Sequence, residues 1–569
     1  MSDRKKTVLK ILLVIIINLF AFAALNGAYD YFKELSDTGE LSDYIGSYGY
    51  INSEEIDKYY NEAQKNINIL NYDMDFDLYP EKKLLKADVT LTGIFNSGKP
   101  ENIGLNFQNN FDVKNVRLNN DKVTDFYFDE NIIYIPIKNS ITDTFKLNLI
   151  YEGTPKNKGL SSFSFDSFNG KSFVYTLSEP IYASTWFPCN DLPNDKALLD
   201  ISITNDSSKI SLSNGKLVEI NTDKDRRTYH WKTIYPISTY LICLYSGNYK
   251  YFFEEYTSTT GEKFNLDYYA FPEHLQMAKS DYKNHSEMMK VFEEKFGPYP
   301  FAKEKYGVAE FLWQGGAMEH QTITGIASNL LNGKGMFQDY YIHELAHQWW
   351  GDAVGPISWK DIWLNEGFAT YCEALYAEAT AGKEALQSTM LAKFQTRFND
   401  QLYDPENLFS STVYDKGAWV LHMLRFEIGE DAFGKLLKEF FSRYKYSNAS
   451  TSDFKNLSEE ISGKNLDQFF NQWVFNGQGI IKCEYGWKAD ATSGNVELTI
   501  KQIQDEYKLY KFPLEIKIKY EDGSDEIHKE YVTTGKQTFN LNARKNIKDI
   551  EIDPDKWLLA TFIKSTTGK

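Results

Sequence analysis

Two histidines four residues apart are the first feature of the chain that points to a specific chemistry. They lie in the run His343-Glu344-Leu345-Ala346-His347, in a region whose apolar periodicity is helical. An α-helix turns by about 100° per residue, so a four-residue step returns both imidazoles to one face of the helix. Two neutral imidazole nitrogens on one face can hold one zinc ion, and the spacing therefore predicts a metal site.

A third ligand for this zinc ion is available nineteen residues after His347. Glu366 lies in the run Trp363-Leu364-Asn365-Glu366-Gly367-Phe368, and the interval is long enough for a turn and the start of an antiparallel helix. Two histidines and one carboxylate leave the fourth tetrahedral position open to water, as a hydrolytic zinc site requires. In such a site Glu344, between the two histidines, is the general base.

The same residues also have a purely structural interpretation. In that interpretation His343 and His347 are core histidines that pack beside Trp349 and Trp350, and Glu366 only caps a helix. A chain with eight histidines in 569 residues contains such a pentad by chance in roughly one case in a hundred. Most such accidents lack a third ligand, whereas this chain offers one, so the metal site is favoured.

Three regions of the chain must position these residues. Residues 70–250 form a predicted β domain, because apolar and polar residues alternate there, as in Leu85, Ala87 and Val89. Residues 251–477 form a mostly helical domain, which includes a helix that ends at Gly297-Pro298. Residues 478–569 alternate again ahead of an Asp522-Gly523 turn and predict a small β-sandwich. A polar helix is predicted ahead of these regions, over residues 54–69.

Length and charge restrict the class of protein. At 569 residues the chain is long enough for three or four domains, and its apolar content of 42% supplies several cores. Its formal net charge of −17 repels a polyphosphate, so nucleic acid is excluded as a partner. Four cysteines are too few for a disulfide framework, so we expect packed thiols. A bridge between Cys189 and Cys243 is allowed in an oxidising compartment but is not required.

The first 28 residues predict a signal peptide or a membrane anchor. Basic residues at positions 4, 5, 6 and 10 precede an apolar run from Ile11 to Leu25 that only Asn18 interrupts. Ala21-Phe22-Ala23 offers a cleavage pattern, whereas an apolar run that continues to Ala28 favours an uncleaved anchor. A buried core helix is the alternative. Both export interpretations place the rest of the chain outside the cytoplasm, membrane-anchored or secreted.

The sequence around the predicted metal site resembles a known family over residues 339–376. Gln348-Trp349-Trp350-Gly351-Asp352 follows the histidine pair, and Trp359-Lys360-Asp361-Ile362-Trp363 leads to Glu366. This pattern resembles the zinc-binding segment of the membrane alanyl aminopeptidase (aminopeptidase N-like) family of zinc gluzincin metallopeptidases. The resemblance implies one zinc ion per chain, held by His343, His347 and Glu366.

Two further segments resemble the substrate-binding parts of that family. Gly316-Ala317-Met318-Glu319-His320 resembles the exopeptidase signature Gly-Ala-Met-Glu-Asn, whose Glu binds the free α-amino group of the substrate. The resemblance thus assigns substrate binding to Gly316, Ala317, Met318 and Glu319. His320 replaces the usual Asn, and we expect a protonated His320 to compete for Glu319, so that acidic pH raises KM. Glu179, before Pro180, matches the second group that binds the amine.

The last matching segment is Val413-Tyr414-Asp415-Lys416-Gly417-Ala418. It resembles the family segment whose Tyr stabilises the oxyanion, and this role passes to Tyr414. Taken alone, such a segment is usually only a helix start, and Glu179 only a solvated loop charge. The order in which all these segments occur along the chain favours the functional interpretation.

The resemblance implies a fold and a function. The expected fold is multidomain α+β, with a β-sheet N-terminal domain, a thermolysin-like zincin catalytic domain and a small C-terminal β-sandwich. The expected function is a zinc-dependent aminopeptidase that hydrolyses N-terminal residues from peptides outside the cytoplasm. The alternatives are an epoxide hydrolase or endopeptidase on the same zinc, and a non-enzymatic surface scaffold. The sequence does not indicate the oligomeric state.

Overall fold

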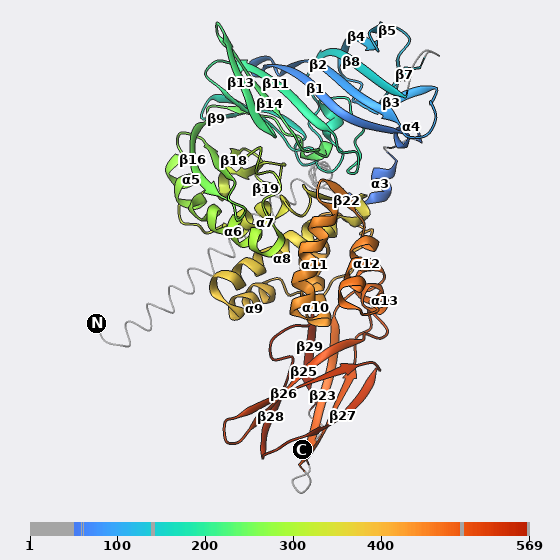
Figure 1. The fold of residues 1–569 in the computed structure, drawn as a ribbon, viewed down its shortest axis with the longest axis vertical. Coiled ribbons are helices and arrows are strands. Elements are labelled where there is room, and N and C mark those ends of the chain that lie inside the picture. Colours follow the sequence, from blue (N-terminus) through green and yellow to red (C-terminus); the bar gives the residue numbers. More distant parts are fainter. Residues whose placement is uncertain (1–50, 59, 61, 138–142, 490–493, 566–569) are drawn as a thin grey trace, which may run out of the picture. The chain divides into compact units, whose positions relative to one another are not determined.

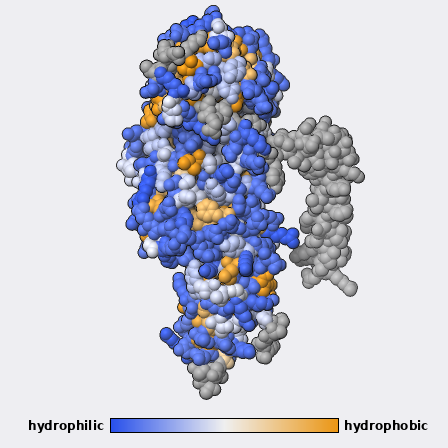
Figure 2. Space-filling view, turned by 90° about the vertical axis from the view of Figure 1, so that its right-hand side faces the viewer, coloured by the Kyte–Doolittle hydropathy of each residue, from blue (hydrophilic) through white to orange (hydrophobic). Residues whose placement is uncertain are grey.

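The computed structural model describes residues 51–565 apart from 59, 61, 138–142 and 490–493. The predicted signal peptide or anchor over residues 1–28 lies outside this part of the chain. Within the described residues, no helix combines the length and the apolarity that crossing a membrane requires. The face drawn in Figure 2 is mostly hydrophilic, with small separate groups of hydrophobic residues.

The first region of the structure is built from strands, as the alternating pattern predicted (Figure 1). An eight-stranded sheet has the order β13-β14-β11-β1-β2-β8-β4-β5, and smaller sheets have the orders β12-β15-β10-β9 and β3-β7-β6. The strands are β1 Ile67–Tyr79, β2 Leu84–Phe95, β3 Asn102–Asn106, β4 Asp112–Leu118, β5 Asp121–Lys122, β6 Tyr127–Asp129, β7 Ile132–Pro136, β8 Thr144–Gly153, β9 Phe163–Phe168, β10 Lys171–Thr176, β11 Leu198–Asp206, β12 Ile210–Leu212, β13 Lys216–Asp223, β14 Arg226–Lys232 and β15 Tyr245–Gly247.

The start of this region corrects the predicted helix over residues 54–69. Only two short helices form there, α3 Ser53–Asp57 and α4 Glu62–Lys65, and β1 already begins at Ile67. Ile67 and Ile69 are buried and pair with residues of β2, whereas Asn68 between them is less buried. The period-two pattern therefore begins inside the predicted helix, and pairing with β2 decides the local structure.

The second region surrounds a five-stranded sheet of order β16-β17-β18-β20-β19 with helices. Its strands are β16 Lys250–Thr257, β17 Lys263–Ala270, β18 Tyr306–Phe311, β19 Ala317–Met318, β20 Ile323–Ala327, β21 Val354–Pro356 and β22 Ser447–Ala449. Its helices are α5 Leu275–Asp281, α6 His285–Phe296, α7 Gln338–His347, α8 Trp363–Ala381, α9 Lys383–Ala392, α10 Gly417–Ile428, α11 Glu430–Tyr444, α12 Thr451–Ser462 and α13 Asp467–Phe470. Helix α6 ends before Gly297, where φ is 121°, as the sequence predicted.

The third region contains two antiparallel-rich sheets, of order β27-β24-β23-β29 and β26-β25-β28. The strands are β23 Ile481–Ala489, β24 Asn495–Gln502, β25 Phe512–Tyr520, β26 Asp525–Val532, β27 Lys536–Asn542, β28 Ile547–Ile552 and β29 Ala560–Lys564. The predicted hairpin is the pair β25 and β26, with Gly523 at φ 86° in its turn. The multidomain α+β class with a C-terminal β-rich region is confirmed. All four cysteines are buried free thiols.

Candidate active site

Helices α7 and α8 bring the three predicted zinc ligands together. His343 and His347 lie one helical turn apart on α7, and Glu366 lies in the first turn of α8. The Oε2 atom of Glu366 is 3.2 Å from Nε2 of His343 and 3.3 Å from Nε2 of His347. In a tetrahedral site with bonds of about 2.0–2.1 Å, donor atoms are separated by roughly 3.3 Å. The donor set therefore fits a zinc ion.

The outer nitrogens of the two histidines are held in different ways. Nδ1 of His347 lies 2.9 Å from the backbone oxygen of Trp350, whereas Nδ1 of His343 lies 3.0 Å from Oε1 of Glu373. The other oxygen of Glu373 accepts a hydrogen bond from Lys393 at 2.7 Å. These partners turn both Nε2 atoms toward the metal position. Glu373 and Lys393 were not predicted from the sequence, although Glu373 lies two helical turns after Glu366 on α8 and could have been found by that spacing.

The predicted general base Glu344 lies buried on α7, with 6% of its surface exposed. Its Oε2 atom has no hydrogen-bond partner among the described residues. Burial raises the pKa of Glu344 above its ordinary value, and the nearby carboxylate of Glu319 adds to this effect. A cation held by the three ligands would oppose this rise. A carboxylate with a free oxygen in a desolvated pocket is suited to accept a proton from water.

Glu179 and Glu319 form a second carboxylate group beside Glu366. One carboxylate oxygen from each of these three residues lies within 4.8 Å of the others. Glu179 and Glu319 are each 4% exposed, and Oε1 of each lacks a partner among the described residues. Burial raises the pKa of both side chains. Buried carboxylates that repel one another require a cation, and a substrate ammonium has the right charge.

The predicted substrate-binding segment ahead of Glu319 forms the edge of the five-stranded sheet. Ala317 and Met318 make up β19, which among the described strands pairs only with β20, in antiparallel fashion. Gly316 precedes the strand at φ 147°, in the region that favours glycine. The free edge of β19 offers backbone hydrogen-bonding groups to an extended peptide.

Tyr414 lies beside the metal ligands. Its ring stacks on His343 with the ring centres 5.9 Å apart and the planes at 18°. Tyr414 belongs to a π-helical turn, Thr412–Lys416, that leads into α10. Burial and the nearby carboxylates raise the pKa of Tyr414, so its hydroxyl stays protonated and can donate a hydrogen bond.

Two glycines fix the distance between Glu366 and Tyr414. Gly367 on α8 faces Gly417 at the start of α10, and a Cβ atom on Gly367 would meet Cα of Gly417 at 2.9 Å. Such a contact leaves no room for a side chain. The close approach therefore holds the segment that carries Tyr414 against the helix that carries Glu366.

The expectation for His320 is wrong. His320 is fully buried, and its Nδ1 atom lies 2.6 Å from the hydroxyl of Tyr245. Burial lowers the pKa of His320 to about 3, because the charged imidazolium loses its hydration. His320 is therefore neutral at ordinary pH. It does not compete for Glu319, and it gives no reason for KM to rise in mild acid.

Two family models match the chain. The Peptidase M1 N-terminal domain model matches residues 68–241, and the Peptidase family M1 domain model matches residues 280–473. Together they cover more than half of the 569 residues. The chain belongs to peptidase family M1, which confirms the resemblance found in its sequence.

Curated relatives are named as aminopeptidases. The chain is 28% identical over 356 residues to probable aminopeptidase 2 of Sulfurisphaera tokodaii, an alignment that covers 58% of this chain and 44% of the relative. It is 30% identical over 332 residues to glutamyl aminopeptidase of Homo sapiens, which covers 53% of this chain and 34% of the relative. The chain spans about half the length, or less, of these relatives.

Solved structures share the fold. Aminopeptidase A of Legionella pneumophila in complex with aspartic acid matches with a TM-score of 0.77 at 18% identity, over 87% of this chain and 59% of that chain. A mutant M1 zinc metallopeptidase of Deinococcus radiodurans, bound to a Tyr-Ser-Ala substrate, matches with a TM-score of 0.63 at 26% identity, over 72% of this chain and 94% of that chain. The family and the donor set together indicate a zinc cofactor.

Proposed function

We propose that the chain is a zinc-dependent aminopeptidase that removes N-terminal residues from peptides. The main support for this proposal is that the buried carboxylates of Glu179 and Glu319 lie beside the donor set of His343, His347 and Glu366. A hydrolytic zinc site alone does not distinguish the end of a peptide from its middle. The adjoining carboxylates make the distinction, because a free α-ammonium is the cation that they lack.

Zinc would be held by the three ligands and, when bound, would polarise the scissile carbonyl and acidify water. Glu344 accepts the proton of the attacking water through its free oxygen and delivers it to the leaving amine. The hydroxyl of Tyr414 donates a hydrogen bond to the oxygen on which negative charge develops. Glu179 and Glu319 hold the substrate ammonium, while the edge strand of Gly316, Ala317 and Met318 aligns the peptide backbone.

The relatives support the proposed activity without extending it. Their names include aminopeptidases of archaeal and animal origin, and a neighbouring structure holds a tripeptide substrate. Since this chain spans only part of the curated relatives, the preferred N-terminal residue of its substrates does not carry over from them.

The decisive experiment uses one peptide in two forms. The purified protein is given the peptide with a free terminus and the same peptide with an N-acetyl cap, and the products are followed by mass spectrometry. Stepwise loss of single residues from the free form alone supports an aminopeptidase. Equal internal cleavage of both forms would identify an endopeptidase and leave Glu179 and Glu319 without the proposed role.

We also propose that the protein works outside the cytoplasm, membrane-anchored or secreted. The support is the basic flank and apolar run within residues 1–28. Fractionation of the producing cells tests this location, because an anchored or exported protein is found with the membranes or in the extracytoplasmic fraction. Recovery of full-length soluble protein from the cytoplasm would overturn it.

A further inference from the structure

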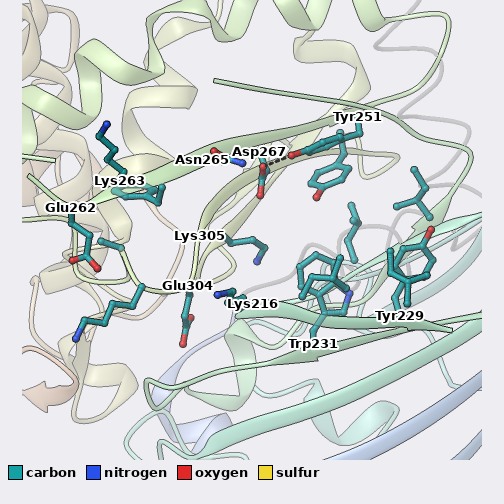
Figure 3. Close-up of a pocket in the computed structure, with 18 residues that line it drawn as sticks. Lys216, Tyr229, Trp231, Tyr251, Glu262, Lys263, Asn265, Asp267, Glu304 and Lys305 are labelled. Atoms are coloured by element: carbon teal, nitrogen blue, oxygen red, sulfur yellow. Dashed lines mark hydrogen bonds between the residues drawn. The ribbon is translucent and has the colours of Figure 1, made fainter. Parts of the chain in front are cut away.

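A cavity of about 740 Å³ lies between two groups of strands (Figure 3). Strands β12, β13 and β14 form one side of it, and strands β16 and β17 with residues 302–305 form the other. None of the residues that line it belongs to the zinc donor set or to the carboxylate pair Glu179 and Glu319. Its volume is in the usual range for small-molecule sites.

Aromatic side chains make up much of the cavity wall. Tyr229 and Trp231 of β14 are almost fully buried, and Phe264 and Tyr269 of β17 line the opposite side. Leu217 of β13 adds an aliphatic surface. Flat, rigid rings of this kind bind apolar side chains at low entropic cost.

An acidic group faces the cavity from β17. Figure 3 shows the carboxylate of Asp267 directed into the space between the two sides. Its Oδ1 atom accepts a hydrogen bond of 2.8 Å from the hydroxyl of Tyr251, which leaves Oδ2 without a partner among the described residues. Partial burial raises the pKa of Asp267, because its charge is incompletely hydrated.

A basic group lies on the floor of the same cavity. The ammonium of Lys305 donates hydrogen bonds of 3.0 Å to the backbone oxygen of Ser213 and to Oγ1 of Thr322, and it lies 5.0 Å from the ring centre of Trp231. In the described part of the chain, no carboxylate lies within ion-pair distance of it. One of its three N–H groups thus remains available.

We propose that this cavity binds a zwitterion with an apolar side chain, supplied as a free amino acid or as a short peptide. Its ammonium binds Asp267, its carboxylate binds Lys305, and its side chain packs against Tyr229 and Trp231. The acid and the base line one cavity but do not form an ion pair with each other, so a molecule that carries both charges completes both groups at once. A purely apolar ligand would leave the charges of Asp267 and Lys305 without partners of opposite charge.

The test is calorimetric titration of the full-length, zinc-loaded Glu344→Gln variant, in which peptides are not turned over. The probes are L-phenylalanine and L-phenylalanyl-L-phenylalanine, and the tighter binder identifies the source of the zwitterion. We expect two binding events per chain. A further Glu319→Ala change should remove the event at the proposed active site, and Asp267→Asn should remove the other.

Blocked probes and matched variants make the test specific. In the Glu319→Ala background, L-phenylalaninamide lacks the carboxylate, N-acetyl-L-phenylalanine lacks the ammonium, and each should bind at least about tenfold more weakly. Asp549→Asn is the control, because Asp549 pairs with Lys564 between β28 and β29 and does not line this cavity. Tyr251→Phe removes only the hydroxyl that orients Asp267, from a side chain that is 45% exposed, and should weaken binding without unfolding the protein.

Absence of any binding event in the Glu344→Gln, Glu319→Ala double variant would overturn the proposal. So would a second event that survives both Asp267→Asn and Lys305→Met in variants whose thermal unfolding shows that they are folded. The result does not depend on the proposed aminopeptidase activity. If Glu319→Ala leaves both events in place, the proposed role of Glu319 is wrong. The effect of Asp267→Asn still shows whether the cavity binds the zwitterion.

Discussion

The zinc donor set and the carboxylate pair Glu179 and Glu319 adjoin each other but satisfy their charges differently. Glu366 lies between two imidazoles, whose attraction lowers its pKa despite burial. Among the described residues, Glu179 and Glu319 have no hydrogen-bonded imidazole, and burial raises their pKa even though His347 attracts both. The donor set is therefore prepared for a permanent metal ion, whereas the carboxylate pair is completed only while a cationic ligand is present.

Of the substitutions that test this difference between the two groups, removal of a metal ligand should cause the largest loss of activity. His343→Ala or Glu366→Ala should lose stoichiometric zinc, measured by metal analysis, and with it all detectable hydrolysis, because two ligands do not hold the ion tightly. Glu344→Gln should keep the zinc and lower kcat on the order of 10²- to 10⁴-fold. His230→Ala, on β14, is the control. Stoichiometric zinc in both ligand variants would show that the donor set is wrong.

Loss of the Tyr414 hydroxyl should cause the second largest loss of activity. Tyr414→Phe keeps the ring that stacks on His343, so the fold and the zinc content should persist. We expect kcat to fall roughly 10²- to 10³-fold, which is the usual cost of one oxyanion donor. Steady-state kinetics checks this. A raised KM with normal kcat would assign Tyr414 to substrate packing instead.

Neutralising the carboxylate pair should have a smaller and more selective effect. Glu319→Gln keeps the shape of the side chain but removes a charge that pairs with the ammonium, so kcat/KM for free peptides should fall roughly 10- to 100-fold. Zinc content should not change. The discrimination against N-acetylated peptides should weaken in parallel, and unchanged discrimination would mean that Glu319 does not bind the amine.

The smallest effect should come from the groups behind His343. Glu373→Gln should weaken zinc affinity roughly 10- to 100-fold, and Lys393→Met should do so by less, because it acts through Glu373. Competition with a chelator measures this affinity without relying on activity. Lys383→Met is the control: it removes a different ion pair, between the first residue of helix α9 and Asp555, and should leave zinc affinity unchanged.

The sequence predicted the zinc site well because its residues are close in the chain and helical geometry relates them. His343, Glu344 and His347 needed only the helical period, and Glu366 needed one turn and a second helix. Lys393 was missed because it reaches Glu373 from the turn that follows helix α9, and such pairing depends on tertiary packing. His320 was misjudged because a sequence does not show burial, which decides its charge. The helix predicted over residues 54–69 failed where pairing with β2 overrode local preference.

The contact between Gly367 and Gly417 restricts how this protein can be stabilised by engineering. Replacing helical glycines by alanine is a common way to stabilise a protein, by about 0.5–1 kcal/mol per site. At these two positions an added methyl group would force α8 and α10 apart and shift Tyr414 relative to Glu366. Gly434 lies in α11, and its added methyl would meet no described atom within 4 Å beyond its chain neighbours and the backbone of its own helix. The same substitution can be made there without disturbing the reaction centre.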